Sequence, residues 1–179
     1  VARALEAGAK AYWVCPLVEE SEVLDLAAAE VRHAELAARL GGDAVALVHG
    51  RMKNADRDAA IAGFIAGSAR ILVATTVIEV GVDVSDATVM VVEHAERFGL
   101  AQLHQLRGRI GRGVHESHCI LVAGEATDEG RRRLDGMERG VDGFALAEED
   151  LRQRGPGELL GQAQSGLPDF KFGTPIDDW

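Results

Sequence analysis

The sequence has no GxxxxGK[ST] loop that could cradle phosphates, and its only lysines are Lys10, Lys53 and Lys171, none of which follows a glycine-rich loop. No acidic Walker B box follows an apolar run, so the groups that usually hold magnesium beside a nucleotide are also missing. No GxGxxG sequence follows the first apolar run, which disfavours a dinucleotide-binding domain of the Rossmann type. On its own, the chain is therefore not expected to hydrolyse a nucleotide.

Paired cysteines and long hydrophobic runs are absent as well. Cys15 and Cys119 occur singly in apolar runs without CxxC spacing, so we expect two buried thiols in a reducing compartment and no disulfide. His115 and His118, beside Cys119, lack a fourth ligand at a usual spacing, which argues against a zinc site. No uncharged apolar run approaches about 18 residues and no signal peptide is visible, so we expect no membrane contact.

The chain of 179 residues is acidic, with a net charge of −10. This charge excludes a generic basic coat for nucleic acid, so any such contact must come from a few placed arginines, backbone amides and helix N-termini. The length suits one domain with an appendage. Because the sequence opens on Val1 in what reads as the end of a helix, and stops at Trp179 without an evident structural ending, we expect a piece of a longer protein.

Five short apolar runs divide the first two thirds of the sequence. Each is hydrophobic at successive positions, which is typical of strands that are buried on both faces of a sheet. They are residues 11–17, 45–49, 71–75, 89–93 and 119–123. Helical patterns separate the first three runs, and strands that alternate with helices predict right-handed crossovers and a parallel sheet. We therefore expect an open α/β lobe.

Two helices are expected between these strands. The first covers residues 22–40 and has an apolar stripe formed by Val23, Leu26, Ala27, Glu30, Val31, Ala34 and Ala38. The second covers residues 54–65, with Asn54 as its N-cap, and its apolar positions are Ala55, Ala59, Ile61, Ala62 and Ile65.

Three polar clusters lie just past the expected strands or in the loops that follow them. They are His49-Gly50-Arg51, Thr75-Thr76 and Gly81-Val82-Asp83. Ligand sites of open parallel sheets gather at the carboxyl ends of the strands, so we expect the three clusters to line one rim. Local alternatives stay open, since the threonines can cap a helix and His49 can be a satisfied imidazole at a strand end. Asp83 lies between two valines, where a carboxylate without a partner is costly.

One stretch of this acidic chain is cationic. Residues 102–113 read QLHQLRGRIGRG, and no acidic residue occurs between Arg97 and His115. In a helix, Gln105, Arg109 and Arg112 would share a face, and guanidinium groups bind phosphate oxygens in pairs. The glycines predict that the helix frays near Gly108, where bare backbone lets an anion approach. The alternative from these residues alone is a helix end whose arginines offset the macrodipole.

Residues 105–112, QLRGRIGR, resemble the QxxGRxGR motif VI of superfamily 2 helicases. Three other stretches resemble the second motor lobe of the RecG family of branch-migration helicases. They are residues 49–52 (HGRM), 74–83 (ATTVIEVGVD) and 154–161 (RGPGELLG). The matches run in order from about residue 11 to residue 166, which is highly specific. The resemblance implies a RecA-like open parallel sheet with helices on both faces, followed by a C-terminal helical hairpin.

The resemblance also implies roles for individual residues. Arg109 and Arg112 would be catalytic arginine fingers. The nucleotide would be bound by Gly81, Asp83, Gln105, Arg109 and Arg112. The DNA contacts would be His49, Gly50, Arg51, Thr75 and Thr76. The cofactors would be ATP and Mg²⁺, shared with a preceding lobe that supplies the phosphate loop, and no metal site is expected in this chain.

The sequence changes character after residue 125. Residues 127–139 are charged and helical in pattern, and two short helical stretches, 144–152 and 158–164, flank a sharp turn at Gly155-Pro156-Gly157. The resemblance implies that this hairpin couples hydrolysis to movement along duplex DNA through Arg154 and Gln164. We therefore divide the chain into a lobe with motifs IV to VI (1–125), a helical segment with the translocation hairpin (126–166) and an irregular end (167–179).

The leading hypothesis is the C-terminal motor lobe of an ATP-dependent helicase that remodels branched DNA, such as stalled forks and Holliday junctions. The expected partners are branched or duplex DNA and the N-terminal RecA-like lobe and wedge domain of the same protein, in the bacterial cytoplasm with the nucleoid. A transcription-repair coupling factor shares motif VI and the hairpin, but residues 12–21 (YWVCPLVEES) and 49–52 favour RecG. A non-motor nucleotide-binding or protein-interaction module is the alternative from another class; a Walker A box and a DExH box upstream would exclude it.

Overall fold

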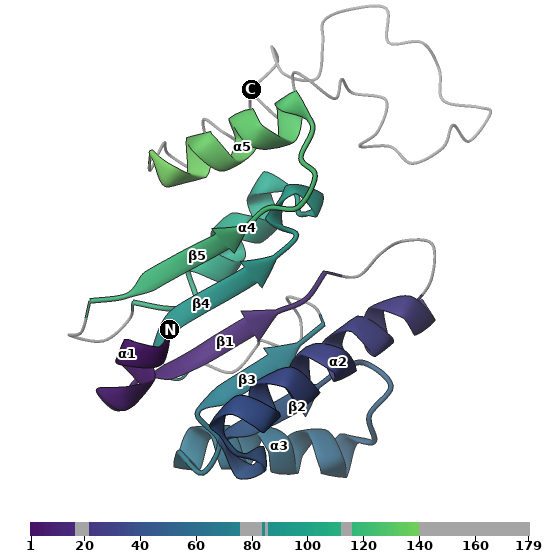
Figure 1. The fold of residues 1–179 in the computed structure, drawn as a ribbon, viewed down its shortest axis with the longest axis vertical. Helices are drawn as coiled ribbons and strands as arrows, with labels where there is room; N and C mark the ends of the chain where they lie inside the picture. The colour runs from purple at the N-terminus through teal and green to yellow at the C-terminus, as the bar shows by residue number, and fades with distance from the viewer. Residues whose placement is uncertain (17–21, 76–83, 85, 112–115, 140–179) are drawn as a thin grey trace, which may run out of the picture.

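The computed structural model describes residues 1–16, 22–75, 84, 86–111 and 116–139. Its centre is a five-stranded sheet in the order β2-β3-β1-β4-β5, and every pairing is parallel (Figure 1). The strands are β1 (Lys10–Val14), β2 (Val45–Val48), β3 (Ile71–Ala74), β4 (Ala87–Glu93) and β5 (His118–Val122). Each of the five apolar runs therefore forms one strand, as predicted, and the open parallel sheet is confirmed.

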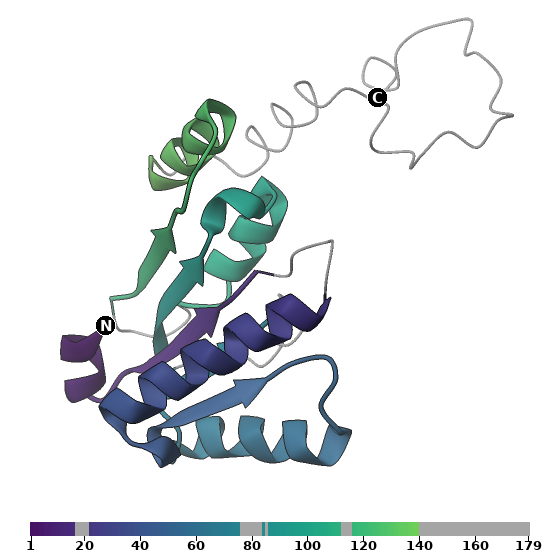
Figure 2. The same cartoon turned by 45° about the vertical axis from the view of Figure 1, so that its right-hand side comes forward.

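Helices cover both faces of this sheet (Figure 2). The α-helices are α1 (Ala2–Glu6), α2 (Glu22–Leu40), α3 (Asn54–Ala66), α4 (Leu100–Arg107) and α5 (Asp128–Glu138), and short 3-10 turns are η1 (Gly42–Ala44) and η2 (Ala95–Arg97). Helices α1 and α2 pack on one face, whereas α3, α4 and α5 pack on the other. None of the described helices has the length and hydropathy that a membrane span requires.

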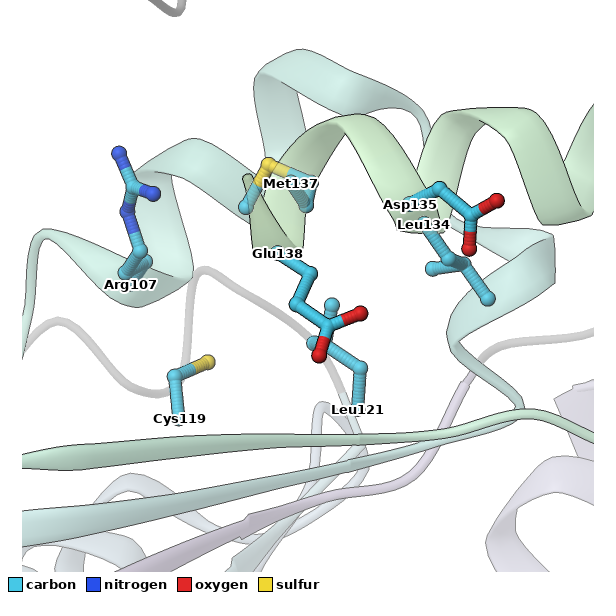
Figure 3. Close-up of a pocket in the computed structure, with 7 residues that line it drawn as sticks. All are labelled: Arg107, Cys119, Leu121, Leu134, Asp135, Met137 and Glu138. Carbon is cyan, nitrogen blue, oxygen red and sulfur yellow. The ribbon is translucent and has the colours of Figure 1, made fainter. Parts of the chain in front are cut away.

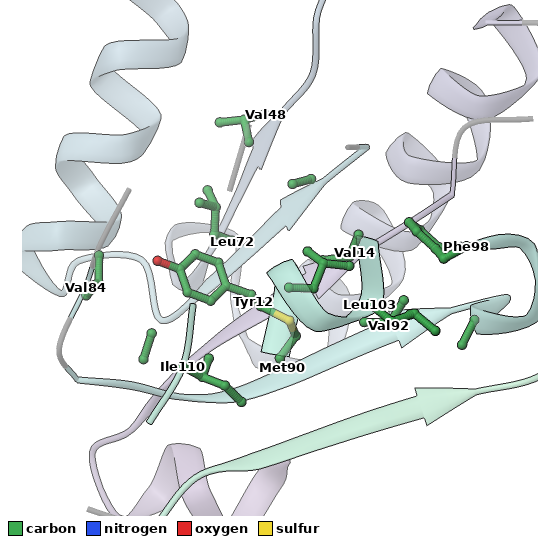
Figure 4. Close-up of a cluster of buried hydrophobic side chains, with 14 of the residues drawn as sticks. Tyr12, Val14, Val48, Leu72, Val84, Met90, Val92, Phe98, Leu103 and Ile110 are labelled. Atoms are coloured by element: carbon green, nitrogen blue, oxygen red, sulfur yellow. The ribbon is translucent and has the colours of Figure 1, made fainter. Parts of the chain in front are cut away.

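Alternate residues of β1 to β4 supply two separate hydrophobic cores, whereas β5 packs on the larger core alone, and Ile120 and Val122 on its other face are exposed. On β1, Tyr12 and Val14 face the α3 and α4 side, whereas Ala11 faces α2. The larger core lies under α3 and α4 and includes Leu72 and Met90 (Figure 4). Because both faces of the central strands are buried, these strands read as continuous apolar runs in the sequence.

The buried faces of α2 and α3 differ from the predicted stripes. On α2, Ala29 is fully buried and Leu36 and Ala37 pack beside it, whereas Val31 is 59% exposed. The imidazole of His33 belongs to the same inward face, since its Nε2 lies 3.1 Å from the carbonyl oxygen of Val45. A polar residue on the buried side and an alanine-rich outer side concealed the true stripe.

On α3, Ile61 packs against the core as predicted, but the fully buried Phe64 and its neighbour Ala60 were missed, and Ile65 is 52% exposed. The predicted N-cap is also wrong, because α3 begins at Asn54 and Lys53 occupies the cap position without a side-chain cap bond. An N-cap residue has an extended backbone, as Lys53 does here, and the chain becomes helical one residue earlier than the sequence suggested.

Helix α4 runs back across the sheet, antiparallel to β4. Phe98, just before the helix, lies toward the carboxyl ends of the strands, and Ile110, just after it, lies toward their amino ends together with Val84 (Figure 4). Leu100, Leu103 and Leu106 anchor the helix to the larger core. The two ends of α4 therefore reach opposite edges of the sheet.

Candidate functional site at the two edges of the sheet

The arginine-rich turn follows α4 at the amino edge of the sheet. The helix ends at Arg107, and Gly108 forms its C-cap, as the glycines predicted. Arg109 is half-buried and Gln105 is exposed on the last turn of the helix. Arg112, the second predicted finger, lies outside the described residues. The described part of the motif thus offers one amide and one guanidinium at a helix end.

Backbone geometry holds this turn in place. The amide N–H groups of Gly108 and Arg109 donate to the carbonyl oxygens of His104 and Leu106, both at 2.9 Å. Gly111 has φ 77°, and a Cβ built on it would lie only 2.6 Å from the Oγ of Ser117. A side chain at position 111 is therefore excluded by conformation and by space. The contact with Ser117, which precedes β5, fixes the turn at the amino edge.

The predicted DNA contacts lie at the opposite, carboxyl edge. His49 directly follows β2 and Thr75 directly follows β3, and the last residues of these strands, Val48 and Ala74, are register partners. The backbone N–H of Arg51 donates to Nδ1 of His49 at 3.3 Å. Thr75 is buried, whereas Gly50 and Arg51 are exposed. Two of the three predicted clusters therefore lie on one rim.

The other predicted site residues cannot be placed. Thr76, Gly81, Asp83, Arg154 and Gln164 lie outside the described residues. Val84 lies before β4, at the edge opposite to His49 and Thr75. The first two clusters therefore lie on one rim, and the third, residues 81–83, is outside the described residues.

A compact polar cluster, which the sequence reasoning missed, lies past the carboxyl end of β4. Glu96 in η2 accepts a hydrogen bond from the backbone N–H of Gly124 at 3.0 Å, and its other carboxylate oxygen lies 3.3 Å from Nδ1 of His94. Burial by itself raises the pKa of Glu96, but hydrogen bonds from Gly124, its own backbone and His94 outweigh this effect and lower it. The carboxylate thus ties the end of β4 to the end of β5.

Glu96→Gln is expected to reduce the free energy of unfolding at pH 7 by on the order of 1 kcal/mol, because the hydrogen bonds from Gly124 and His94 would meet a neutral amide instead of a partly exposed carboxylate. A carboxyl group whose folded pKa is depressed stabilises the fold above its unfolded pKa of about 4.3, and this contribution is lost as pH falls through the folded pKa. Urea unfolding of both proteins from pH 7 to pH 3 measures it. A difference that stays constant down to pH 3 would contradict the assignment.

A second charged network lies on the α2 side of the same edge. Nε of Arg32 on α2 is 2.7 Å from Oε1 of Glu93, the last residue of β4, and its guanidinium lies 5.7 Å from the ring centroid of Trp13. Burial and the neighbouring Glu93 carboxylate raise the pKa of the Cys15 thiol to about 12. This cysteine is therefore protonated and unreactive at neutral pH.

A cavity of about 460 Å³ lies between α4, β5 and α5 (Figure 3). Among the described residues that line it, Arg107 is the one cation, and the carboxylates of Asp135 and Glu138 oppose it. Leu121 and Leu134 form apolar walls. Two carboxylates beside one guanidinium repel the phosphates of a nucleotide. The cavity is therefore a poor candidate for the nucleotide site, unlike the arginine-bearing turn.

Comparison with known proteins identifies the family of this lobe. Residues 3–114, which contain all but the last strand of the sheet, match the model of the helicase conserved C-terminal domain. The chain belongs to this family. It is the C-terminal lobe of a superfamily 2 helicase, and the predicted RecA-like fold is confirmed.

Helicase C-terminal domains of RecG proteins are similar to this chain over nearly its whole length. The RecG ATP-dependent DNA helicases of Acidithiobacillus ferridurans and Escherichia coli K12 are 54% and 51% identical to it, over 97% and 96% of the chain. The chain spans 26% and 25% of these relatives, about a quarter of their length.

Solved structures agree. RecG bound to a three-way DNA junction superposes with a TM-score of 0.72 at 43% identity, over 94% of this chain and 21% of the other. The C-terminal domain of the DEAD-box protein Dbp5 superposes with a TM-score of 0.56 at 16% identity, over 85% and 88% of the two chains, and shares the fold.

Proposed function

We propose that the chain is the C-terminal motor lobe of an ATP-dependent helicase that translocates on double-stranded DNA and remodels branched structures such as stalled forks and Holliday junctions. The main support is the arrangement around α4. The arginine-bearing turn lies at the amino ends of the strands, and the polar rim of His49 to Arg51 and Thr75 lies at their carboxyl ends. The similarity to RecG helicases supports the choice of branched DNA as the substrate.

In this proposal Arg109 and Arg112 are catalytic and bind the terminal phosphates of ATP, with Gln105, Gly81 and Asp83 completing this half of the nucleotide site. A half-buried guanidinium at a helix end fits phosphate oxygens, because its fork donates two parallel hydrogen bonds. The described residues contain no group of three metal-binding side chains, so Mg²⁺ fits the preceding lobe instead. When bound, magnesium would neutralise phosphate charge beside the arginines.

The carboxyl rim is proposed to hold one DNA strand through its backbone. Gly50 lets the main chain approach closely, Arg51 is exposed, and a hydroxyl group such as that of Thr76 suits phosphate oxygens. Thr75 is buried, so in this proposal it supports the rim from below. Such contacts position the duplex without reading its sequence. The net charge of −10 then requires that the remaining acidic surface face away from the DNA.

The remaining partners follow from the same proposal. The N-terminal RecA-like lobe would supply the phosphate loop, the wedge domain would select branched DNA, and the bacterial nucleoid is the expected location. Residues 126–166 would form the segment with the translocation hairpin, in which Arg154 and Gln164 couple hydrolysis to movement.

The full-length protein is expected to hydrolyse ATP faster with forked DNA than without it, and to separate the fork. In the same assays, Arg154→Ala should retain substantial ATP turnover but lose strand separation, because a coupling residue lies away from the chemistry. Melting temperatures of both proteins serve as the control. Strand separation that falls only in proportion to turnover or folded fraction would refute the coupling role, and absent DNA stimulation of the unaltered protein would refute the motor.

A further inference from the structure

His94 is held in a backbone conformation that its side chain disfavours. Among the described residues it is the only non-glycine with a positive φ, at φ 47° and ψ 47°. A Cβ crowds the backbone in this region, so such a residue persists where its surroundings require it, and such outliers concentrate at functional sites. The outlier directly follows β4 at the carboxyl edge.

Specific contacts impose this conformation and aim the ring. The carbonyl oxygen of His94 accepts the N–H of Arg97 at 2.9 Å, and Nδ1 of the ring lies 3.3 Å from the Glu96 carboxylate. Gly124 packs so closely that a Cβ there would lie 2.8 Å from Nδ1. The backbone N–H of Gly124 also binds Glu96, so β5 and η2 together clamp the imidazole.

The place of His94 in the sheet favours contact with a ligand. In the sheet order β2-β3-β1-β4-β5, the connection after β1 leads to β2 on one side. The connection after β4 leads to β5 on the other side. The direction of the connections therefore reverses between β1 and β4. Ligands of open parallel sheets bind in the crevice at the carboxyl ends on either side of this reversal. His94 borders this crevice, on the same edge as His49 and Thr75.

The ring of His94 can offer a hydrogen-bond donor to an anionic ligand. Because the ionised carboxylate of Glu96 only accepts hydrogen bonds, Nδ1 donates its proton to it. The side chain of His94 is 51% exposed, which leaves Nε2 for an incoming group. The nearby Glu93 carboxylate is paired with Arg32 at 2.7 Å, so its charge is already offset. Because Nδ1 is bound to Glu96, Nε2 can donate to a phosphate oxygen only when both ring nitrogens carry a proton.

We propose that His94 is a further contact to the DNA sugar-phosphate backbone, which extends the carboxyl rim beyond β1. Three strand spacings of about 4.8 Å separate the ends of β2 and β4, so the rim from His49 to His94 spans about 14 Å, or about four phosphates at roughly 3.4 Å of helix axis each. This inference rests on the DNA-binding role proposed for the rim.

The test uses the full-length protein with His94 replaced by glycine or asparagine. Both residues tolerate a positive φ, so each removes the imidazole and leaves the backbone unstrained. The DNA concentration for half-maximal ATP turnover should rise roughly three- to tenfold, and the dependence of log affinity on log salt concentration should weaken by about one unit. Turnover at saturating DNA should stay at the level of the unaltered protein.

A second variant tests whether Glu96 and Gly124 aim the ring. Gly124→Ala keeps the imidazole but displaces it, so it should weaken DNA binding in the same way and add little in the His94→Gly background. Unchanged half-saturation and salt dependence in His94→Gly would overturn the inference, and so would a loss of turnover at saturating DNA alone. If the unaltered protein shows no DNA-dependent turnover, the proposed function fails instead.

Discussion

Arg112→Ala in the full-length protein is expected to lower DNA-stimulated ATP turnover by roughly 10³- to 10⁵-fold, the usual contribution of an arginine finger. This corresponds to about 4 to 7 kcal/mol of transition-state stabilisation at 1.36 kcal/mol per decade. The reason is that a guanidinium stabilises charge that develops on the transferred phosphoryl group. Arg109→Ala should behave in the same way. Fork binding without nucleotide should change little in either variant.

Arg107→Ala is the matched control for these two substitutions. This arginine precedes Arg109 by two residues but lines the cavity beside Cys119 and Glu138. Its removal should leave turnover close to that of the unaltered protein. Steady-state ATPase rates at saturating fork, with fork affinity measured separately, distinguish the cases. Normal turnover in Arg112→Ala, or an equal loss in Arg107→Ala, would refute the finger assignment.

Phe64→Ala is expected to destabilise the chain by about 3 to 5 kcal/mol, the usual cost of deleting a buried aromatic ring. The ring of Phe64 is fully buried, and its centroid lies 5.1 Å from that of the Tyr12 ring. Nζ of Lys10 lies 5.9 Å from the centroid of the Phe64 ring. The substitution therefore leaves a cavity beneath α3 and removes a neighbour of a buried ammonium group. The melting temperature should fall by on the order of 10 °C.

Ile65→Ala, at the next position, provides the comparison. The side chain of Ile65 is 52% exposed, so its truncation should change stability by no more than about 0.5 kcal/mol. The hydrogen bond of 2.7 Å from Lys10 Nζ reaches the backbone carbonyl of Ile65 and survives in this variant. Urea unfolding of both variants measures the contrast. Equal losses would mean that α3 packs through another face.

Strands β1 to β4 could be predicted from the sequence because burial on both faces leaves a continuous apolar run, whereas the prediction that β5 is buried on both faces was wrong, since Ile120 and Val122 are exposed. Helix faces could not be predicted, because alanine is frequent on α2 and α3 and is compatible with either side. His33 illustrates the difficulty, since an imidazole that is satisfied by the carbonyl oxygen of Val45 faces inward, while Val31 faces solvent. Partners that are distant in sequence decided which side was buried.

One part of the candidate site could be predicted from the sequence and another could not. The glycines of the arginine-rich turn indicated correctly where α4 ends, because a helix is weak at Gly108. His94 was missed because its left-handed backbone depends on Glu96 and on Gly124, which belongs to another strand end. Its location after the fourth apolar run nevertheless indicated a possible ligand contact, because ligands of open parallel sheets bind at the carboxyl ends of the strands where the strand order reverses.

Helix α4 has a mechanical consequence. Its eight residues form a helix about 12 Å long, and the buried side chains of Leu100, Leu103 and Leu106 pack it against the sheet along this length. A helix packed in this way does not easily slide or bend relative to the sheet, so a force on the arginine-bearing turn moves α4 and the sheet together. In the proposed motor, a movement of the arginine-bearing turn would therefore be transmitted through α4 to the carboxyl rim at the other end of the strands.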